Sequence, residues 1–526
     1  MPTKVTQWLI LFAVCTASVA QAEEPLSAIN WLSTSQQDPA FSVAGPTNGT
    51  IANQPAVIGE VPTVKGGAVP EAVSVTVLGQ ASIDAVGLLP GRVTGFPNDL
   101  WGLGKSAEIA TKIRKMSLDG LPSLQSLFMT TLLAEAAAPV DSTGDGLLLL
   151  ARIDKLLEIG ALEQAQALIS AAGPASSSEV RRRGFDVSLL LGDEEDACVM
   201  AKATLNNAAA LAARVFCLAR SGDWPAAALT LQTAKALGRI APTEISILER
   251  FLDGEALDGA LAPPPPLPVT PLYWRIYEAI GEPIPTSTLP PAFAHAELSD
   301  RSGWKAQLEA AERLVRAGAL PGNVLLGLYT EREPAASGGV WDRADAFQRL
   351  DQAMIKGDAA AVDQRLPVAF ARMRDVEIES AFASLFADRL SHLPLSGDAA
   401  QIAYQLGLLS PHFGTLANSP LGGNDPRAQF LRGLALGNLK DVTPTDSMAR
   451  AIAPAFIDPV VPDEAVQMIE EHRVGEAIFL AMNLVQAGVN GELVKVSGGL
   501  SILRRLGLET VARRTALELM ILERRG

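Results

Sequence analysis

Apolar and polar positions follow a helical period over most of this chain, and the helices come in pairs. From about Leu147, an apolar stretch ends at a glycine, and an acidic or small residue then opens a second stretch rich in alanine. Gly160, Gly192 and Gly222 mark three such junctions, spaced 32 and then 30 residues apart. This spacing is close to the roughly 34-residue period of tetratricopeptide repeats. The sequence therefore predicts stacked αα-hairpins, with three unrelated hairpins as the alternative.

The residues at each junction suit this geometry. Glycine adopts the left-handed conformation that ends a helix, an acidic residue stabilises the first turn of the next helix, and a proline such as Pro225 is tolerated there. The aromatic and proline signature of the tetratricopeptide family is missing, so the copies are degenerate. Near the carboxyl end, Gly475 and Gly507 repeat the spacing of 32 residues. We expect the last helix, from residue 508 to about residue 524, to cap the array.

Two stretches interrupt the helical pattern. Residues 23–85 contain many glycines, prolines and small polar residues without a helical period, which indicates a flexible linker. Residues 263–271 begin with four consecutive prolines, which cannot lie in a helix and predict a stiff linker. We therefore expect an all-α fold with two helical lobes: an N-terminal helical-repeat domain over residues 86–262 and a C-terminal helical domain over residues 272–526.

The amino terminus has the pattern of a secretory signal peptide over residues 1–22. Lys4 precedes a short apolar stretch, and small residues permit cleavage after Ala22. An uncleaved anchor helix is the alternative, but the apolar stretch is short for that role. A bulky residue before Cys15 argues against a lipoprotein. Beyond this segment no apolar run is long enough to form a transmembrane helix.

Composition and charge limit the cellular compartments and the classes of partner that suit this protein. Alanine and leucine dominate while aromatic and β-branched residues are scarce, which favours helices over sheets. Arginine outnumbers lysine, as is common in bacteria with GC-rich genomes, so the signal peptide predicts a periplasmic protein. The formal net charge of −15 repels phosphate backbones, and nucleic acid is therefore a poor candidate partner.

Two cysteines, Cys198 and Cys217, would remain after signal cleavage. An oxidising compartment favours pairing them. Cys198 falls in the second helix of one hairpin and Cys217 in the first helix of the next, each about ten residues from a turn near residues 207–208. Such positions lie at matching heights in an antiparallel pair, so we predict a disulfide. Two buried free thiols are the alternative.

The sequence contains no recognisable catalytic, metal or nucleotide motif. We predict no cofactor, no metal and no catalytic residue. None of the histidines pairs with another at metal-ligand spacing; they are His295, His392, His412 and His472.

Carboxylates need no motif to act together, so an enzyme remains the competing hypothesis. Glu331, Glu333 and Asp342 surround the loop at residues 334–339, and Trp341 follows it directly. This arrangement would suit an exposed glycan site. Solvated charges on a connecting loop are the alternative.

Two groups of residues are candidates for partner binding. A short amphipathic motif at residues 25–33 could dock on a partner or fold back onto its own domain; its candidate residues are Leu26, Ile29, Trp31 and Leu32. A second group follows the polyproline segment: Tyr273, Trp274, Tyr277, Trp304, Tyr329 and Trp341. Aromatic side chains with a polar group are typical of interfaces, and they are also typical of ordinary cores.

Several segments carry a family resemblance: residues 25–32, 86–90, 99–102, 327–332 and 337–343. They resemble a group of exported α-proteobacterial helical-repeat proteins of unknown function, sometimes labelled "antifreeze glycopeptide polyprotein". The Thr-Ala-Ala repeats of antifreeze glycopeptides do not occur in this chain. The resemblance spans nearly the whole chain and implies export and architecture, without chemistry or site residues.

These observations together predict a non-catalytic periplasmic scaffold. Stacked helical hairpins usually hold partners on their surfaces and do not catalyse reactions. The expected partners are proteins of a cell-envelope machine, in cell-wall synthesis, division or the flagellar motor. The alternative is an enzyme that acts on peptidoglycan or another glycan through its carboxylates.

Overall fold

The structure of the chain is a computed structural model, which describes residues 82–526 apart from residues 118–119, 174–175, 203–208, 254–262, 523 and 525–526. The predicted signal peptide at residues 1–22, the motif at residues 25–33 and the linker as far as residue 81 lie outside the described residues. Within the described residues the chain forms helices joined by turns, and the β-type contact among them is one isolated bridge between Leu89 and Ala134. The predicted all-α class is confirmed.

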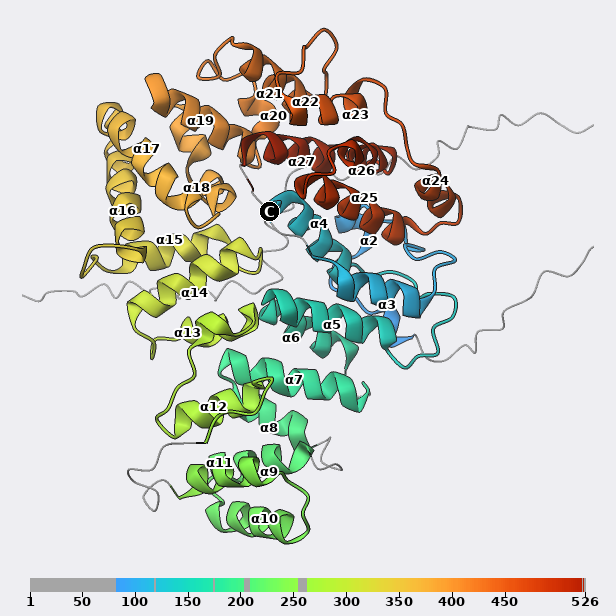
Figure 1. The fold of residues 1–526 in the computed structure, drawn as a ribbon, viewed down its shortest axis with the longest axis vertical. Coiled ribbons are helices and arrows are strands. Elements are labelled where there is room, and N and C mark those ends of the chain that lie inside the picture. Colours follow the sequence, from blue (N-terminus) through green and yellow to red (C-terminus); the bar gives the residue numbers. More distant parts are fainter. Residues whose placement is uncertain are drawn as a thin grey trace, which may run out of the picture. The chain divides into compact units, whose positions relative to one another are not determined.

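The predicted hairpin region forms consecutive helices that pack on one another (Figure 1). They are α5 (Leu147–Ile159), α6 (Leu162–Ala172), α7 (Ser178–Leu191), α8 (Glu194–Lys202), α9 (Ala209–Arg220), α10 (Trp224–Ala236) and α11 (Pro242–Leu252). The glycines at 160, 192 and 222 all have left-handed φ angles, of 87°, 87° and 85°. At the third junction, Asp223 accepts a hydrogen bond from the Ala226 amide at 3.1 Å and so caps α10. The three predicted junctions are confirmed.

Further helices precede and follow this region. Before it lie η1 (Ile83–Ala85), α2 (Gly91–Thr94), α3 (Ser106–Lys115) and α4 (Pro122–Leu133). After it lie α12 (Pro271–Ala279), η3 (Thr286–Thr288), η4 (Pro291–Phe293), α13 (Ala294–Glu297), α14 (Trp304–Arg316), α15 (Gly322–Glu331), α16 (Val340–Lys356), α17 (Ala359–Arg374), α18 (Glu379–Ser391), α19 (Gly397–Leu409), α20 (Phe413–Leu416), α21 (Pro426–Leu436), α22 (Ser447–Ile452), α23 (Pro454–Ile457), α24 (Asp463–Glu470), α25 (Val474–Val489), α26 (Val494–Arg505) and α27 (Glu509–Ile521). In this described part of the chain, no helix is both long enough and apolar enough to cross a bilayer.

The hydrophobic core continues across the polyproline segment. One cluster of buried side chains extends from Phe185 on α7 to Tyr277 on α12. The buried Arg275 of α12 donates from Nε to the carbonyl oxygen of Leu189 at 2.8 Å, close to the carboxyl end of α7. A cation at that end is favourable because the last carbonyl groups of a helix carry partial negative charge. The predicted boundary at residues 263–271 therefore does not divide the core, since α12 completes the core of the helices before it.

The last helix packs against the first long helices of the described chain. α27 contacts α4 as well as α19, α21 and α26 (Figure 1). α4 begins after Leu121, which provides no side-chain cap. The Ser123 amide instead donates to both carboxylate oxygens of Glu518 at 3.0 Å, and the Ser123 hydroxyl donates to the same carboxylate at 2.7 Å. A side chain from α27 thus supplies the hydrogen-bond acceptor that the start of α4 lacks.

This packing overturns the expectation that the last helix is a terminal cap. A cap would bury one face and expose the other, whereas α27 has buried side chains on several sides. Glu518 and Thr515 are buried beneath α4, and the Thr515 hydroxyl lies 2.8 Å from that of Ser123. The array does not end freely at α27, because this helix fills the space between the amino-terminal and carboxyl-terminal helices.

The glycine junction predicted at Gly475 is wrong. Gly475 lies inside α25, and the left-handed residue between α24 and α25 is His472, with a φ of 58°. A Cβ atom added at Gly475 would lie 2.4 Å from the Trp101 ring, so this glycine makes room for a side chain from the amino-terminal part of the described chain. Gly507, by contrast, has a φ of 78° between α26 and α27, as the pattern predicted.

A buried carboxylate forms a second link between the two ends of the described chain. Glu476 of α25 pairs with Lys112 of α3 and accepts a hydrogen bond from Arg473 Nε at 2.7 Å. Burial acts to raise the pKa of Glu476, but the hydrogen bonds from Arg473 and Lys112 outweigh burial, and the pKa lies below its ordinary value. The charged form of Glu476 is therefore more stable in the folded state than in the unfolded state.

We expect Glu518→Ala to lower the free energy of unfolding by about 2–4 kcal/mol, because the amide and hydroxyl of Ser123 would lose their buried acceptor. Urea denaturation measures this change. Glu492→Ala is the matched control, since Glu492 is exposed and its ion pair among the described residues is with Lys495, and it should change stability by less than about 0.5 kcal/mol. Equal effects of the two variants would contradict the proposed cap.

We expect the stabilisation by Glu476 to be lost in acid. A carboxylate whose folded-state pKa is lowered contributes its full stabilisation above its unfolded pKa, about 4.3, and loses it as the pH falls through the folded value. Glu476→Gln should therefore be less stable than the unmodified protein at pH 7, and the difference should shrink between pH 5 and pH 3. Urea denaturation across this pH range tests it. Glu464→Gln, at an exposed position, should leave the pH profile unchanged.

Candidate functional site

The three aromatic candidates of α12 are buried. Tyr273, Trp274 and Tyr277 are 6%, 5% and 3% exposed. Their polar atoms have partners inside the protein: the Tyr273 hydroxyl donates to Glu244 at 2.8 Å, the Trp274 indole donates to a backbone carbonyl oxygen at 3.0 Å, and the Tyr277 hydroxyl donates to the Pro263 carbonyl oxygen. The first contact joins α12 to α11, the second joins it to the segment that follows, and the third holds the start of the polyproline segment against α12.

The later aromatic candidates belong to a second cluster of buried side chains. Trp304 is buried and lies against the partly buried Trp341, with ring centroids 5.2 Å apart. Tyr329 is fully buried and donates its hydroxyl to Glu312, which also accepts two hydrogen bonds from Arg343 at 2.7 and 2.6 Å. Burial and the neighbouring Glu312 carboxylate raise the pKa of Tyr329. This group is a hydrogen-bonded part of the core.

The aromatic cluster is therefore not an exposed partner-binding surface. Aromatic side chains with a polar group suit a core whenever that group finds a hydrogen-bond partner, and each polar group described above has one. The spacing of Leu272, Tyr273, Ile276 and Tyr277 along α12 was a signal of burial, because these residues form one apolar face. The other predicted partner-binding residues, at positions 26, 29, 31 and 32, lie outside the described residues.

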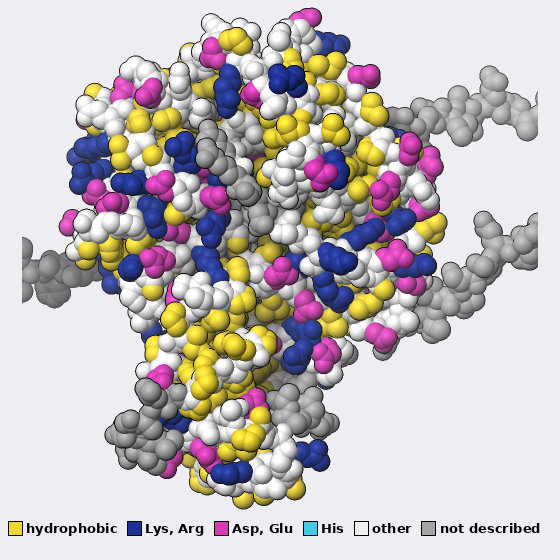
Figure 2. Space-filling model, viewed as in Figure 1, with side chains coloured by type: hydrophobic (Ala, Val, Ile, Leu, Met, Phe, Trp, Pro, Cys, Tyr) yellow, Lys and Arg dark blue, Asp and Glu magenta, His cyan; other side chains and the backbone are white. Residues whose placement is uncertain are grey.

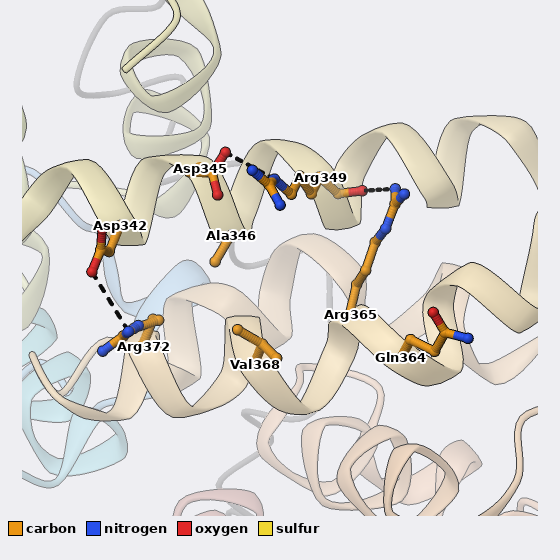
Figure 3. A pocket seen from close by; sticks show the side chains of 8 residues that line it. All are labelled: Asp342, Asp345, Ala346, Arg349, Gln364, Arg365, Val368 and Arg372. Atoms are coloured by element: carbon orange, nitrogen blue, oxygen red, sulfur yellow. Dashed lines mark hydrogen bonds and ion pairs between the residues drawn. The ribbon is translucent and has the colours of Figure 1, made fainter. Parts of the chain in front are cut away.

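The structure places a solvent-open groove between α16 and α17, which form an antiparallel pair (Figure 3). The groove has a volume of about 390 Å³. Ala346 and Val368 lie across from each other at its centre, and Val368 is 54% exposed. Charged and polar side chains surround them: Asp342, Asp345, Arg349, Gln364, Arg365 and Arg372. In Figure 2, basic and acidic side chains alternate on the side of the molecule where Figure 1 places these two helices.

Two ion pairs within the groove are exposed and differ in length. Asp345 pairs with Arg349 at 2.9 Å along α16, and Asp342 pairs with Arg372 of α17 at 3.6 Å. Arg365 takes part in none of the ion pairs of the described residues, and its Nη1 donates to the carbonyl oxygen of Arg349 at 2.8 Å. Because a guanidinium has five N–H donors, Arg365 has several left to offer to the groove. The lining residues carry three positive and two negative charges in a chain whose net charge is −15.

Two of the three loop carboxylates considered for glycan chemistry have structural partners. Asp342 accepts a hydrogen bond from the Gly338 amide at 2.8 Å in addition to its pair with Arg372. Glu331 pairs with the neighbouring Arg332, and Glu333 is exposed. Asp342 is therefore the one of these three carboxylates that lines the groove, and it also orders the loop before α16.

A recess of about 360 Å³ lies elsewhere, between the end of α5 and the end of α14. Arg316 and Glu158 line it, together with Glu377 from the turn between α17 and α18. This recess borders residues 118–119, which are outside the described residues, so we place the candidate site in the α16–α17 groove.

Neither metal geometry nor similarity to known proteins adds to this assignment. Among the described residues, no three His, Cys, Asp or Glu side chains are grouped so that they could hold a metal ion. His295, for example, is partly buried with its Nε2 2.6 Å from the Gly160 carbonyl oxygen, and the loss of solvent around it lowers its pKa to about 4. Comparisons of the chain with protein-family models, curated proteins and solved structures find no match.

The predicted disulfide between Cys198 and Cys217 is confirmed. It joins α8 to α9, and the two Cα atoms are 5.5 Å apart. Both cysteines pack against the same hydrophobic cluster as α7 and α12. The turn expected near residues 207–208 lies outside the described residues, but the pairing of α8 with α9 agrees with the predicted hairpin.

We expect Cys198→Ala/Cys217→Ala to lower the free energy of unfolding by about 3 kcal/mol, because the bridge closes a loop between residues 19 apart and restricts the unfolded chain. Urea denaturation measures the loss. Peptide mapping after alkylation is the direct control: protein purified without reductant should carry no label at either cysteine, and reduced protein should carry both. Labelling of both cysteines without reductant would show that the bridge does not form.

Proposed function

We propose that this protein is an exported, non-catalytic scaffold that holds protein partners of a cell-envelope machine in the periplasm. The machine would serve cell-wall synthesis, division or the flagellar motor. The α16–α17 groove is the observation that carries this proposal. It is open to solvent, it is lined by charged side chains on two paired helices, and its centre is apolar. Helical-hairpin proteins use such surfaces between helices to bind other chains.

The disulfide and the sequence of the amino terminus support a periplasmic location. Disulfides persist mainly in oxidising compartments, and the Cys198–Cys217 bridge joins helices that already pack together. The signal-peptide pattern at residues 1–22 and the resemblance to exported helical-repeat proteins agree with this location.

Reversible crosslinking in intact cells, followed by purification of the full chain, tests the scaffold proposal. We expect the same small set of envelope proteins in repeated captures, at levels at least about tenfold above those for an exported protein of similar size and charge. Capture of no protein above this control would overturn the proposal. The amino-terminal segment should be kept in the protein used, because residues 25–33 are a second candidate docking motif.

A zymogram on purified cell wall tests the competing enzyme hypothesis. We expect no clearing by the purified protein. Clearing that disappears in Glu331→Gln or Glu333→Gln would overturn the scaffold proposal and favour hydrolysis by paired carboxylates. Glu309→Gln is the matched control, because Glu309 is exposed on α14 and pairs with Lys305.

A further inference from the structure

We infer that the α16–α17 groove binds a short acidic helix of a partner protein, with one carboxylate on Arg365 and a second on Arg372. This inference rests on the scaffold function proposed above, and it adds the chemistry of the partner. The partner helix would carry an acidic residue, an apolar residue three or four positions later, and an acidic residue seven positions after the first.

The spacing of the groove residues leads to this pattern. On α17, Arg365, Val368 and Arg372 follow one another by three and four positions, so they lie on one face of the helix. A rise of 1.5 Å per residue puts the backbones of Arg365 and Arg372 about 10 Å apart. A helix laid along the groove has positions seven residues apart at the same spacing, and the residue between them would meet Val368.

The charges favour carboxylates at both ends. Arg365 is half-buried and donates to a backbone carbonyl oxygen, and it takes part in none of the ion pairs described. The Arg349 side chain runs along α16 toward Asp345, with which it pairs, so Arg365 supplies the free guanidinium at this end of the groove (Figure 3). A carboxylate there would receive charge-assisted hydrogen bonds from a guanidinium that is already held in place. At the other end, Arg372 pairs with Asp342 at 3.6 Å and with Asp375 at 3.8 Å, and both pairs are long and exposed, so an incoming carboxylate can compete for Arg372.

The apolar centre favours a protein segment over a free anion or a lipid headgroup. Val368 is 54% exposed, and the buried Ala346 faces it across the groove. Apolar contact flanked by charge-assisted hydrogen bonds is the usual arrangement of a protein interface. A phosphate or a headgroup would use the arginines and leave Val368 exposed. Asp342 and Asp345 would also repel a dense anionic surface more strongly than they would repel a helix with two spaced carboxylates.

Site-directed photocrosslinking in the native cell tests this inference. A photoreactive phenylalanine analogue replaces Val368 in the full chain, and the crosslinked peptide is identified by mass spectrometry. A second variant of the full chain carries the analogue at Val460 and serves as the control, because Val460 is 71% exposed and lies outside the groove. We expect the residue-368 adduct to be a protein segment with acidic residues seven positions apart and an apolar residue between them.

Charge reversal distinguishes recognition from simple proximity. Arg365→Glu should reduce the residue-368 adduct roughly tenfold, because a carboxylate would then face a carboxylate. Arg374→Glu is the matched control: Arg374 is exposed on the same helix, nine positions on and therefore on the opposite side. This control should leave the adduct unchanged. Replacing the first acidic residue of the crosslinked segment by Lys should restore the adduct with Arg365→Glu.

Each other outcome overturns the inference. A lipid adduct, a segment without the acidic pattern, or an adduct that Arg365→Glu does not change would each show that the groove does not recognise an acidic helix. Partners captured by crosslinking elsewhere, with no adduct at residue 368, would overturn the groove assignment and leave the scaffold proposal standing. Capture of no partner at any position would overturn both.

Discussion

The hydrogen bonds from Ser123 to Glu518 are the contact on which the arrangement of the described helices depends. The start of α4 is buried and has no cap of its own, so its amide must find an acceptor away from water. That acceptor comes from α27, 395 residues further along the chain. The pairing of Lys112 with Glu476 links α3 to α25 in the same way. These two contacts hold the carboxyl-terminal helices against the amino-terminal ones, and the remaining hairpins lie between them in sequence.

Elsewhere in the described chain, buried backbone groups again take their hydrogen-bond partners from distant side chains, here from arginines that donate to carbonyl oxygens. Arg152 of α5 is 1% exposed and donates to the carbonyl oxygens of Leu132, Val86 and Ala134, and burial lowers its pKa to about 10. Arg275 binds the end of α7 in the same manner. Such contacts satisfy loop and helix-end carbonyl groups that burial would otherwise leave without a donor. The contact of Arg275 with Leu189 also joins α12 to a helix that precedes the proline-rich segment.

The groove residues differ from these structural charges because they face solvent. α16 shows both roles: Arg343 forms hydrogen bonds with the buried Glu312, while Asp345 and Arg349 lie on the open side toward α17. One face of the helix therefore stabilises the core, and the other is available to a partner. Because exposed ion pairs contribute little to stability, the arrangement of Asp345 and Arg349 can be exchanged for contacts with another chain at small cost.

Local pattern in the sequence determined the helical class, the hairpin junctions at Gly160, Gly192 and Gly222, and the Cys198–Cys217 bridge. Each of these depends on residues within about one repeat of each other, where helical period and turn chemistry decide the geometry. Only the tertiary structure decided that Gly475 makes room for Trp101, that the aromatic residues of α12 are core, and that α27 is buried. A helical period shows which residues share a face, but it does not show which distant helix that face meets. The groove lies within one hairpin and was missed for a different reason: its arginines read as ordinary surface charges, because a helical period marks apolar faces and not the exposed charges that line a groove.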